Sequence, residues 1–229
     1  MLRATVLGLM LSLVLATRVE AQLASPAPPG PYAIDARGAI SGLPVDAGFY
    51  PSAPTGTNVP GRGPGIDVGG HVYPWQLGIA RLGIGATLLR TRGSASAAVA
   101  SSGSQSTDTV TPDASMTLTV LAPQLSFNFG TSAGWSYLSA GVGRARIASA
   151  TSAFGSATSQ GGVTPADEVN SGFRHSVNIG AGARWFAKPR LGVSFDLRVY
   201  VISAGKASET RPATPRATVT VGSVGISVR

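Results

Sequence analysis

The sequence has 229 residues and no cysteine, which excludes a disulfide framework and any site built on a thiolate. Charged residues make up only 12% of the chain, well below the roughly 25% that is typical of soluble domains. After residue 21 there is no run of 18 continuous apolar residues, so no helical membrane span is expected there. The net charge is +8, but no basic run is interleaved with aromatic residues, and nucleic acid is not an expected partner.

The N-terminal segment has the pattern of a secretory signal peptide, which we assign to residues 1–21. Arg3 precedes an apolar stretch at 4–17, and Val19-Glu20-Ala21 provides the small residues of a cleavage site before Gln22. As a helix the apolar stretch would span about 21 Å, too short for a bilayer core of about 30 Å. We expect residues 22–31 to form a Pro-rich extended lead-in and residues 32–229 to form a single exported domain.

Segments in which apolar and polar residues alternate dominate the rest of the chain and predict β-strands. Eight of them are expected, at 32–42, 65–73, 79–90, 116–129, 135–147, 174–186, 193–201 and 217–228. Two are expected to change phase, near Ala122-Pro123 through a bulge and at Gly222-Ser223. Long connections alternate with connections of about five residues, which predicts an up-and-down antiparallel meander with its long loops at one end.

The two faces of these segments differ in charge, and this difference indicates which face is inside. The apolar faces are almost free of charge, whereas the polar faces mix charged residues with Gly, Ser, Thr and Asn. The interior of an eight-stranded barrel is narrow enough to be filled by side chains, and charges buried there must pair. We therefore predict a structural charge network in the lumen and an apolar outer band. The predicted network consists of Asp35, Arg37, Asp67, His71, Arg81, Arg174, Arg184, Asp196 and Arg198.

Aromatic residues cluster near the segment ends, as the interfacial girdles of a membrane barrel do. The residues expected in such a girdle are Tyr32, Tyr73, Trp75, Phe129, Trp135, Trp185, Phe186 and Tyr200.

Four glycine-rich segments carry a resemblance to a known family: IDVGGHVYP (66–74), ARLGIGATL (80–88), GWSYLSAGVGRA (134–145) and HSVNIGAGARWF (175–186). With the turns between them, they resemble the eight-stranded outer-membrane β-barrel proteins of the OmpA/OmpX type, in their barrel domain alone. The resemblance implies an all-β, eight-stranded antiparallel up-and-down transmembrane β-barrel, monomeric and located in the bacterial outer membrane. It also implies a structural or surface-interaction role without catalysis, with outer-membrane lipids and lipopolysaccharide as partners and an unidentified partner at the cell surface.

Two other readings of the sequence remain open. A soluble exported barrel of the lipocalin type, binding a small apolar ligand, would need the charged faces outside and the apolar faces inside. A lipid-modifying outer-membrane enzyme would need a Ser or Asp within hydrogen-bond reach of His71 or His175. The two histidines are far apart in the sequence and lack nearby ligand residues, and the G-x-G segments lack the third glycine of a nucleotide-binding loop. No catalytic residue, metal site or cofactor is therefore expected.

Overall fold

A computed structural model of the chain describes residues 30–51, 53, 57–96, 113–152, 167–208 and 212–229. The predicted signal peptide, 1–21, and all but the last two residues of the predicted lead-in lie outside the described residues. Within the described ranges, no helix has the length and apolar character needed to cross a membrane.

Alternating sequence patterns give rise to nine strands in the described part of the chain. The strands are β1 (Tyr32–Gly42), β2 (Arg62–Leu77), β3 (Ala80–Ala95), β4 (Ala114–Thr131), β5 (Gly134–Thr151), β6 (Asp167–Asn170), β7 (Arg174–Trp185), β8 (Leu191–Ile202) and β9 (Ala217–Val228). A single turn of 3-10 helix, η1 (Ala47–Phe49), lies between β1 and β2. The first and last strands have the predicted bounds, and most of the others are longer than predicted at their ends.

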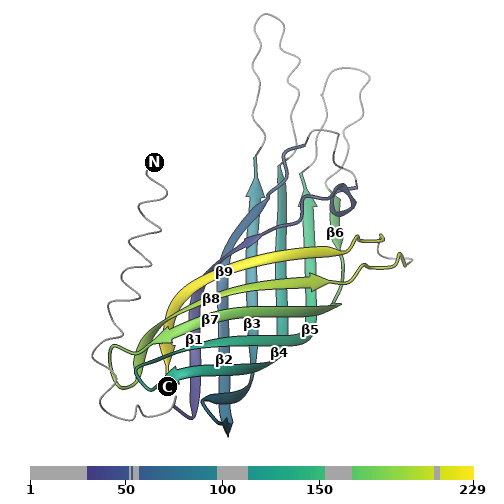
Figure 1. Cartoon of the computed structure of the whole chain (residues 1–229). Coiled ribbons are helices and arrows are strands. Elements are labelled where there is room, and N and C mark those ends of the chain that lie inside the picture. The colour runs from purple at the N-terminus through teal and green to yellow at the C-terminus, as the bar shows by residue number, and fades with distance from the viewer. Residues whose placement is uncertain (1–29, 52, 54–56, 97–112, 153–166, 209–211) are drawn as a thin grey trace, which may run out of the picture.

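Eight of these strands close into a barrel in which neighbouring strands are antiparallel. The sheet runs β4-β3-β2-β1-β9-β8-β7-β5, and the additional pairing of β4 with β5 closes it. The short strand β6 extends the sheet beside the end of β5 (Figure 1). The predicted all-β, eight-stranded antiparallel barrel is confirmed, and closure leaves no long strand without a partner on either side.

The predicted alternation of long and short connections is also confirmed. The short connections are 78–79, 132–133 and 186–190, and they share one end of the barrel with the start of β1 and with the C-terminus (Figure 1). Gly78 occupies the tight turn between β2 and β3 with φ at +58°, a backbone conformation that favours glycine. The longer connections all start and finish at the opposite end, which we call the upper end.

The apolar side chains of the strands lie on the outer face in one half of the barrel and on the inner face in the other half. In the lower barrel, the half with the short connections, large apolar residues such as Leu125 on β4 and Ile226 on β9 are exposed on the outer face. The inner face of that half is polar, with Gln124, Ser126 and Asn128 buried on β4. In the upper barrel, Met116, Leu118 and Val120 of the same strand are buried inside.

The two predicted changes of phase, at Ala122-Pro123 and at Gly222-Ser223, are wrong. Pairing between β4 and β5 skips two residues on each strand, from Leu121–Arg144 to Gln124–Gly141, so there is no bulge at Ala122-Pro123. The pairing of β9 with β8 is likewise uninterrupted through Gly222 and Ser223. The alternation keeps its phase in both strands, and what changes is which face is apolar.

A register shift that was not predicted occurs in β2. Val72 and Trp75 are three residues apart, whereas their partners Ile84 and Leu82 on β3 are two residues apart. Pro74 lies in this irregular stretch, and a proline without a backbone N–H is tolerated where ladder pairing is interrupted. The extra residue indicates a β-bulge near the lower end of the barrel.

The connection between β1 and β2 folds over the upper barrel and closes it. Phe49 and Tyr50 are buried in the apolar cluster of the upper barrel, where Ser149 on β5 donates a hydrogen bond to the carbonyl oxygen of Phe49. Asp46 caps the short helix by accepting a hydrogen bond from the backbone N–H of Gly48 at 2.8 Å. Burial raises the pKa of Tyr50 to about 12. The cluster also contains Leu43, Leu89, Met116, Leu118, Val120, Ile147, Tyr200, Ile202, Val219 and Val221.

Of the eight residues predicted for the aromatic girdle, four lie on the outer face, three point into the lumen, and Phe186 packs partly buried against Trp135. Tyr32, Trp75, Phe129 and Trp185 are exposed on the outer face near the lower end. Three others point inward instead, because they fall on the buried positions of the alternation: Tyr73, Trp135 and Tyr200.

Candidate functional site

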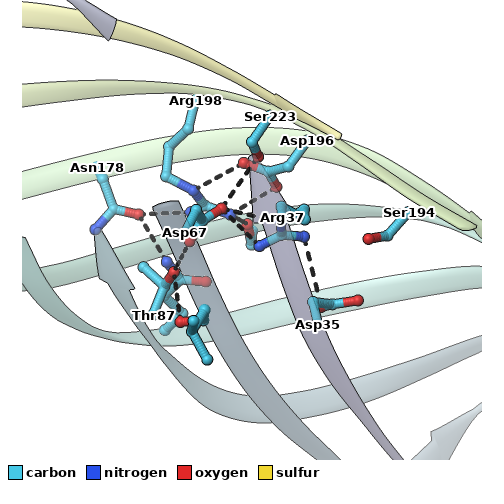
Figure 2. A network of polar contacts seen from close by, with 12 residues as sticks. Asp35, Arg37, Asp67, Thr87, Asn178, Ser194, Asp196, Arg198 and Ser223 are labelled. Carbon is cyan, nitrogen blue, oxygen red and sulfur yellow. Dashed lines mark hydrogen bonds and ion pairs between the residues drawn. The ribbon is translucent and has the colours of Figure 1, made fainter. Parts of the chain in front are cut away.

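The lumen of the lower barrel contains three aspartates and three arginines that contact one another. Asp35 and Arg37 lie on β1, Asp67 on β2, Arg184 on β7, and Asp196 and Arg198 on β8. All six fall on inward positions of their strands and are at most 4% exposed. The alternating pattern thus brings residues that are distant in the sequence to one level of the lumen, as Figure 2 shows for five of them.

Asp35 is held between two arginines. Arg184 donates from Nε to Oδ1 at 3.0 Å and from Nη2 to Oδ2 at 2.6 Å, which is a bidentate, charge-assisted contact. Arg37 approaches the same carboxylate at 3.5 Å. The Arg184 guanidinium also lies over the ring of Tyr137, 4.4 Å from its centroid, so that its face as well as its edge is in contact.

Asp67 is contacted by side chains from three other strands. Arg37 contacts its Oδ2 through both Nε and Nη2 at 2.9 Å. Thr87 on β3 donates to Oδ1, and Ser223 on β9 donates to Oδ2 at 3.1 Å. Figure 2 shows this carboxylate at the centre of the network. Its charge is therefore compensated by one guanidinium and two hydroxyl donors.

Tyr137 on β5 joins the two halves of the network. Its hydroxyl accepts a hydrogen bond from Arg37 at 3.2 Å and donates one to Asp196 at 2.7 Å. Arg198 contacts Asp196 at 3.0 Å and also donates to Asn178 on β7 at 2.7 Å and to Ser139 on β5 at 2.9 Å. Gln124 on β4 donates to Asn178 at 3.5 Å, so all eight barrel strands contribute a side chain.

The network is electrically balanced, with three carboxylates facing three guanidinium groups. Isolated charges in such a dry interior would be very costly, and pairing with additional hydrogen bonds compensates for that cost. The arrangement leaves the lumen filled with interlocked side chains at this level. Each of the six charged groups contacts at least one group of opposite charge.

The other three residues predicted for the network lie outside these contacts. Arg81 lies near the lower end, where it donates to the side chain of Gln76 at 2.8 Å. Arg174 lies at the start of β7, toward the upper end, with its guanidinium beside Gly205. His71 is buried in the lumen and stacks on Tyr73 with 6.5 Å between the ring centroids. The structure thus brings six of the nine residues together and places these three around them.

Sequence reasoning missed the uncharged members of the network. Tyr137 and Ser139 face inward because Leu138, between them, faces outward, so the alternation of β5 contained a usable signal. Thr87, Asn178 and Ser223 occupy equivalent inward positions on their strands. A prediction restricted to charged residues could not find these hydrogen-bonding partners.

The lower end of the lumen is filled by aromatic side chains. Tyr73 meets Trp135 edge to face, and Trp135 stacks on Phe186 with 4.9 Å between ring centroids. The guanidinium of Arg229 lies 4.2 Å from the centre of the Phe186 ring and donates to the backbone carbonyl of Ser132. Together with the apolar cluster above, these residues enclose the charge network from both ends.

The two histidines do not meet in the structure. His71 points into the lumen, whereas His175 is exposed on the outer face of β7 and its backbone carbonyl accepts a hydrogen bond from Ser203. In the described part of the chain, no group of three or more His, Cys, Asp or Glu residues is arranged to hold a metal ion.

Comparison with known proteins gives similarity at the level of fold. No protein-family profile and no curated protein matches the sequence. Among solved structures, Ail, the attachment invasion locus protein of Yersinia pestis, is 12% identical with a TM-score of 0.48, covering 87% of this chain and 98% of Ail. Neisserial surface protein A is 14% identical with a TM-score of 0.46, covering 87% of this chain and 97% of that protein. The outer membrane enzyme PagL is 15% identical with a TM-score of 0.41, and the coverage is 86% of this chain and 98% of PagL.

The class of the protein follows from its own strand pairing. Eight antiparallel strands close on themselves, with a polar interior and an apolar outer face in the lower barrel. The predicted resemblance to eight-stranded barrels of the OmpA/OmpX type is thereby confirmed at the level of the fold.

Proposed function

We propose that the chain is an integral protein of the bacterial outer membrane, and that the lower barrel spans the bilayer. The observation that supports this proposal most strongly is the apolar outer face of the lower barrel. Large side chains on several strands are about half exposed or more, a surface that is unfavourable in water and suited to lipid. They include Ile34, Ile66, Leu125, Ile179, Leu197 and Ile226.

The height of this surface fits a membrane. On β4 the outward apolar residues extend from Leu121 to Phe129. Nine residues cover about 26 Å along a strand, or about 20 Å along the membrane normal when the strand is tilted by about 40°. The apolar band of outer-membrane barrels is about 25 Å tall. The outward row of Tyr32, Trp75, Phe129 and Trp185 would then mark the interface on the side of the short connections.

The orientation follows from the lengths of the connections. In outer-membrane barrels the short turns face the periplasm and the long loops face outward. The upper barrel and its long connections would then project from the cell surface. Its Ser/Thr/Gly-rich loops include residues 97–112 and 153–166, which lie outside the described residues. This arrangement supports a structural or surface-interaction role as a monomer, with the lipids of the outer membrane, lipopolysaccharide included, as its surroundings.

The two alternative readings fit the structure less well. A lipocalin-like barrel requires Arg37, Arg184 and Arg198 on the outside, and all three are buried in the lumen. A lipid-modifying enzyme requires a Ser or Asp hydrogen-bonded to a histidine ring. In the described ranges neither His71 nor His175 has such a partner through its ring nitrogens. We therefore propose a role without catalysis.

Cell fractionation combined with gel electrophoresis tests the membrane assignment. Expressing cells are separated into soluble, inner-membrane and outer-membrane fractions, and each fraction is run with and without boiling. We expect the protein in the outer-membrane fraction, with a mobility that changes on boiling because a closed barrel resists detergent until it is heated. Recovery in the soluble periplasmic fraction would overturn the proposal.

A further inference from the structure

Four arginines form a patch on the outer face of the barrel, which we call the arginine patch. Arg90 and Arg92 lie on β3, and Arg144 and Arg146 lie on β5, on either side of β4. Thr119 of β4 pairs with Arg90 on one side and with Arg146 on the other, so these three residues lie in one row. Neighbouring strands are about 4.8 Å apart, and this spacing places the two arginines about 10 Å apart at the backbone.

The patch lies where the outer face of the barrel changes character. On the lower side, Leu88, Leu121 and Val142 are exposed members of the apolar face. On the upper side, the residues between the arginines are Thr117 and Thr119. The arginines thus lie at the upper edge of the apolar band: Arg90 and Arg144 are two residues along their strands from Leu88 and Val142, and Arg92 and Arg146 are four residues from them.

The positive charge of the patch is not neutralised by the described residues around it. Arg146 donates from Nε to the side chain of Asn170 at 2.9 Å, and Arg144 pairs in register with His175. The four ion pairs found in the described ranges all lie in the lumen. Glu168 on β6 pairs with Ala150, four residues along β5 from Arg146, and is the nearest acidic residue along that strand pair. Arg90 and Arg92 lie two residues apart on the same face of β3, as do Arg144 and Arg146 on β5, so their like charges repel and an external anion explains this concentration best.

We propose that the arginine patch binds the phosphate groups of lipopolysaccharide in the outer leaflet. This inference rests on the proposed function, because it requires the lower barrel to lie in the outer membrane with the upper barrel outside. Arginine binds phosphate with a planar fork of N–H donors and keeps its charge at all physiological pH values. The position adds selectivity, since the acyl chains of the same lipid would lie against Leu88, Leu121 and Val142 directly below.

The width of the patch favours a ligand with more than one phosphate. Arg90 and Arg146 lie on opposite sides of β4, and Arg92 and Arg144 extend the patch upward and downward along their strands. Thr117 pairs with Arg92, and Thr119 pairs with both Arg90 and Arg146, so their hydroxyl groups are further donors within the patch. A lipid with a single phosphate would leave part of this surface without a counter-charge.

The test compares a variant that lacks the four arginines of the patch with a control variant that loses four positive charges elsewhere. The variant carries Arg90→Gln, Arg92→Gln, Arg144→Gln and Arg146→Gln. The control carries Lys188→Gln, Arg190→Gln, Lys206→Gln and Arg216→Gln, four exposed basic residues elsewhere. Both chains are purified in detergent, and retention of the heat-dependent mobility shift shows that each is folded. Binding is measured with purified lipopolysaccharide, with lipopolysaccharide stripped of its phosphates, and with phosphatidylglycerol micelles.

We expect the arginine variant to bind lipopolysaccharide on the order of 100-fold more weakly than the unaltered chain, since each basic group near an anionic surface contributes a several-fold factor. The control should lose less than about fivefold, and removal of the phosphates should weaken binding to the unaltered chain as much as the substitutions do. Equal binding by variant and control would overturn the proposed site. Phosphatidylglycerol binding as strong as that of lipopolysaccharide would overturn the choice of lipid. A soluble periplasmic location would instead overturn the proposed function.

Discussion

The lower and upper halves of this barrel use the same strands with opposite chemistry on their faces. In the lower barrel a balanced network of three aspartates and three arginines fills the interior, and apolar residues face outward. In the upper barrel an apolar cluster fills the interior, while Arg90, Arg146 and threonines face outward. The strand backbone and its alternation continue unchanged between them. Side-chain alternation thus defines the two faces of the barrel wall but does not determine which of them is apolar in each half.

Breaking one charge pair in the lower barrel should have the largest effect. Arg184→Gln leaves the buried carboxylate of Asp35 with Arg37 as its one remaining guanidinium contact. We expect the free energy of unfolding in lipid vesicles to fall by about 4 kcal/mol, because an under-compensated buried charge remains. Urea titrations followed by tryptophan fluorescence measure the change.

A double variant provides the control for this effect. Asp35→Asn combined with Arg184→Gln removes both charges and should recover more than half of the loss. A double variant as unstable as the single one would mean that packing of the Arg184 side chain, and not its charge, accounts for the stability.

A lysine introduced on the outer face should destabilise the protein more from the lower barrel than from the upper barrel. The expected effect is smaller than that of breaking the charge pair. Leu125 and Ser115 point outward on β4, the first from the lower barrel and the second from the upper barrel. Leu125→Lys should lower the free energy of unfolding in vesicles by about 2 kcal/mol, because the charge enters the apolar part of the bilayer. Ser115→Lys on the same strand, whose partners Ser94 and Ala150 are uncharged, should change it by less than about 0.5 kcal/mol. Equal effects of the two lysines would contradict the proposed position of the bilayer.

The smallest effect is expected at the cap of the upper barrel. The hydroxyl of Tyr50 is buried and forms no hydrogen bond with the described residues, so Tyr50→Phe should leave stability near neutral pH unchanged. The pKa of Tyr50 is raised from its ordinary value of 10.0 to about 12 by burial. Between these values the unfolded chain releases the proton more readily than the folded one, so the stability contributed at this residue is present below pH 10 and is lost as pH rises toward 12.

Unfolding curves of the two chains on either side of pH 10 measure this contribution. The unaltered chain should lose more stability than Tyr50→Phe on going to alkaline pH. Parallel losses in the two chains would show that Tyr50 does not ionise on unfolding.

Much of the fold was predictable because alternation is a local property of the sequence. The bounds of β1 and β9 and the inward positions of Asp35, Arg37 and Arg198 follow from it directly. The alternation of β5 also indicates that Tyr137 faces inward, although the predicted network included charged and histidine residues alone. The prediction and the structure agree wherever a segment keeps one polarity along its whole length.

The two wrongly predicted phase changes share one physical cause. At Ala122-Pro123 and at Gly222-Ser223 the apolar residues move from the odd to the even positions of the strand, or the reverse. In the sequence alone this change looks the same as a phase shift. Only the three-dimensional closure shows that the phase is constant and that the apolar side chains change from one face to the other. Strand β6 escaped prediction because four residues are too few to show a period, and Arg81 and Arg174 lie near the barrel ends, where alternation does not indicate depth.

The charge network also has a consequence for the order in which the barrel assembles. Arg184 and Asp35 are 149 residues apart in the chain, and Ser223 and Asp67 are 156 residues apart. These contacts can form only after the last strand has reached the first, so they contribute nothing to early hairpins. A slip of β9 by one residue would turn Ser223 outward and Val224 inward, against Asp67. The lumen charges are therefore fully paired only when the barrel closes in the correct register at the final step of folding. An incorrectly closed barrel would retain charges without partners.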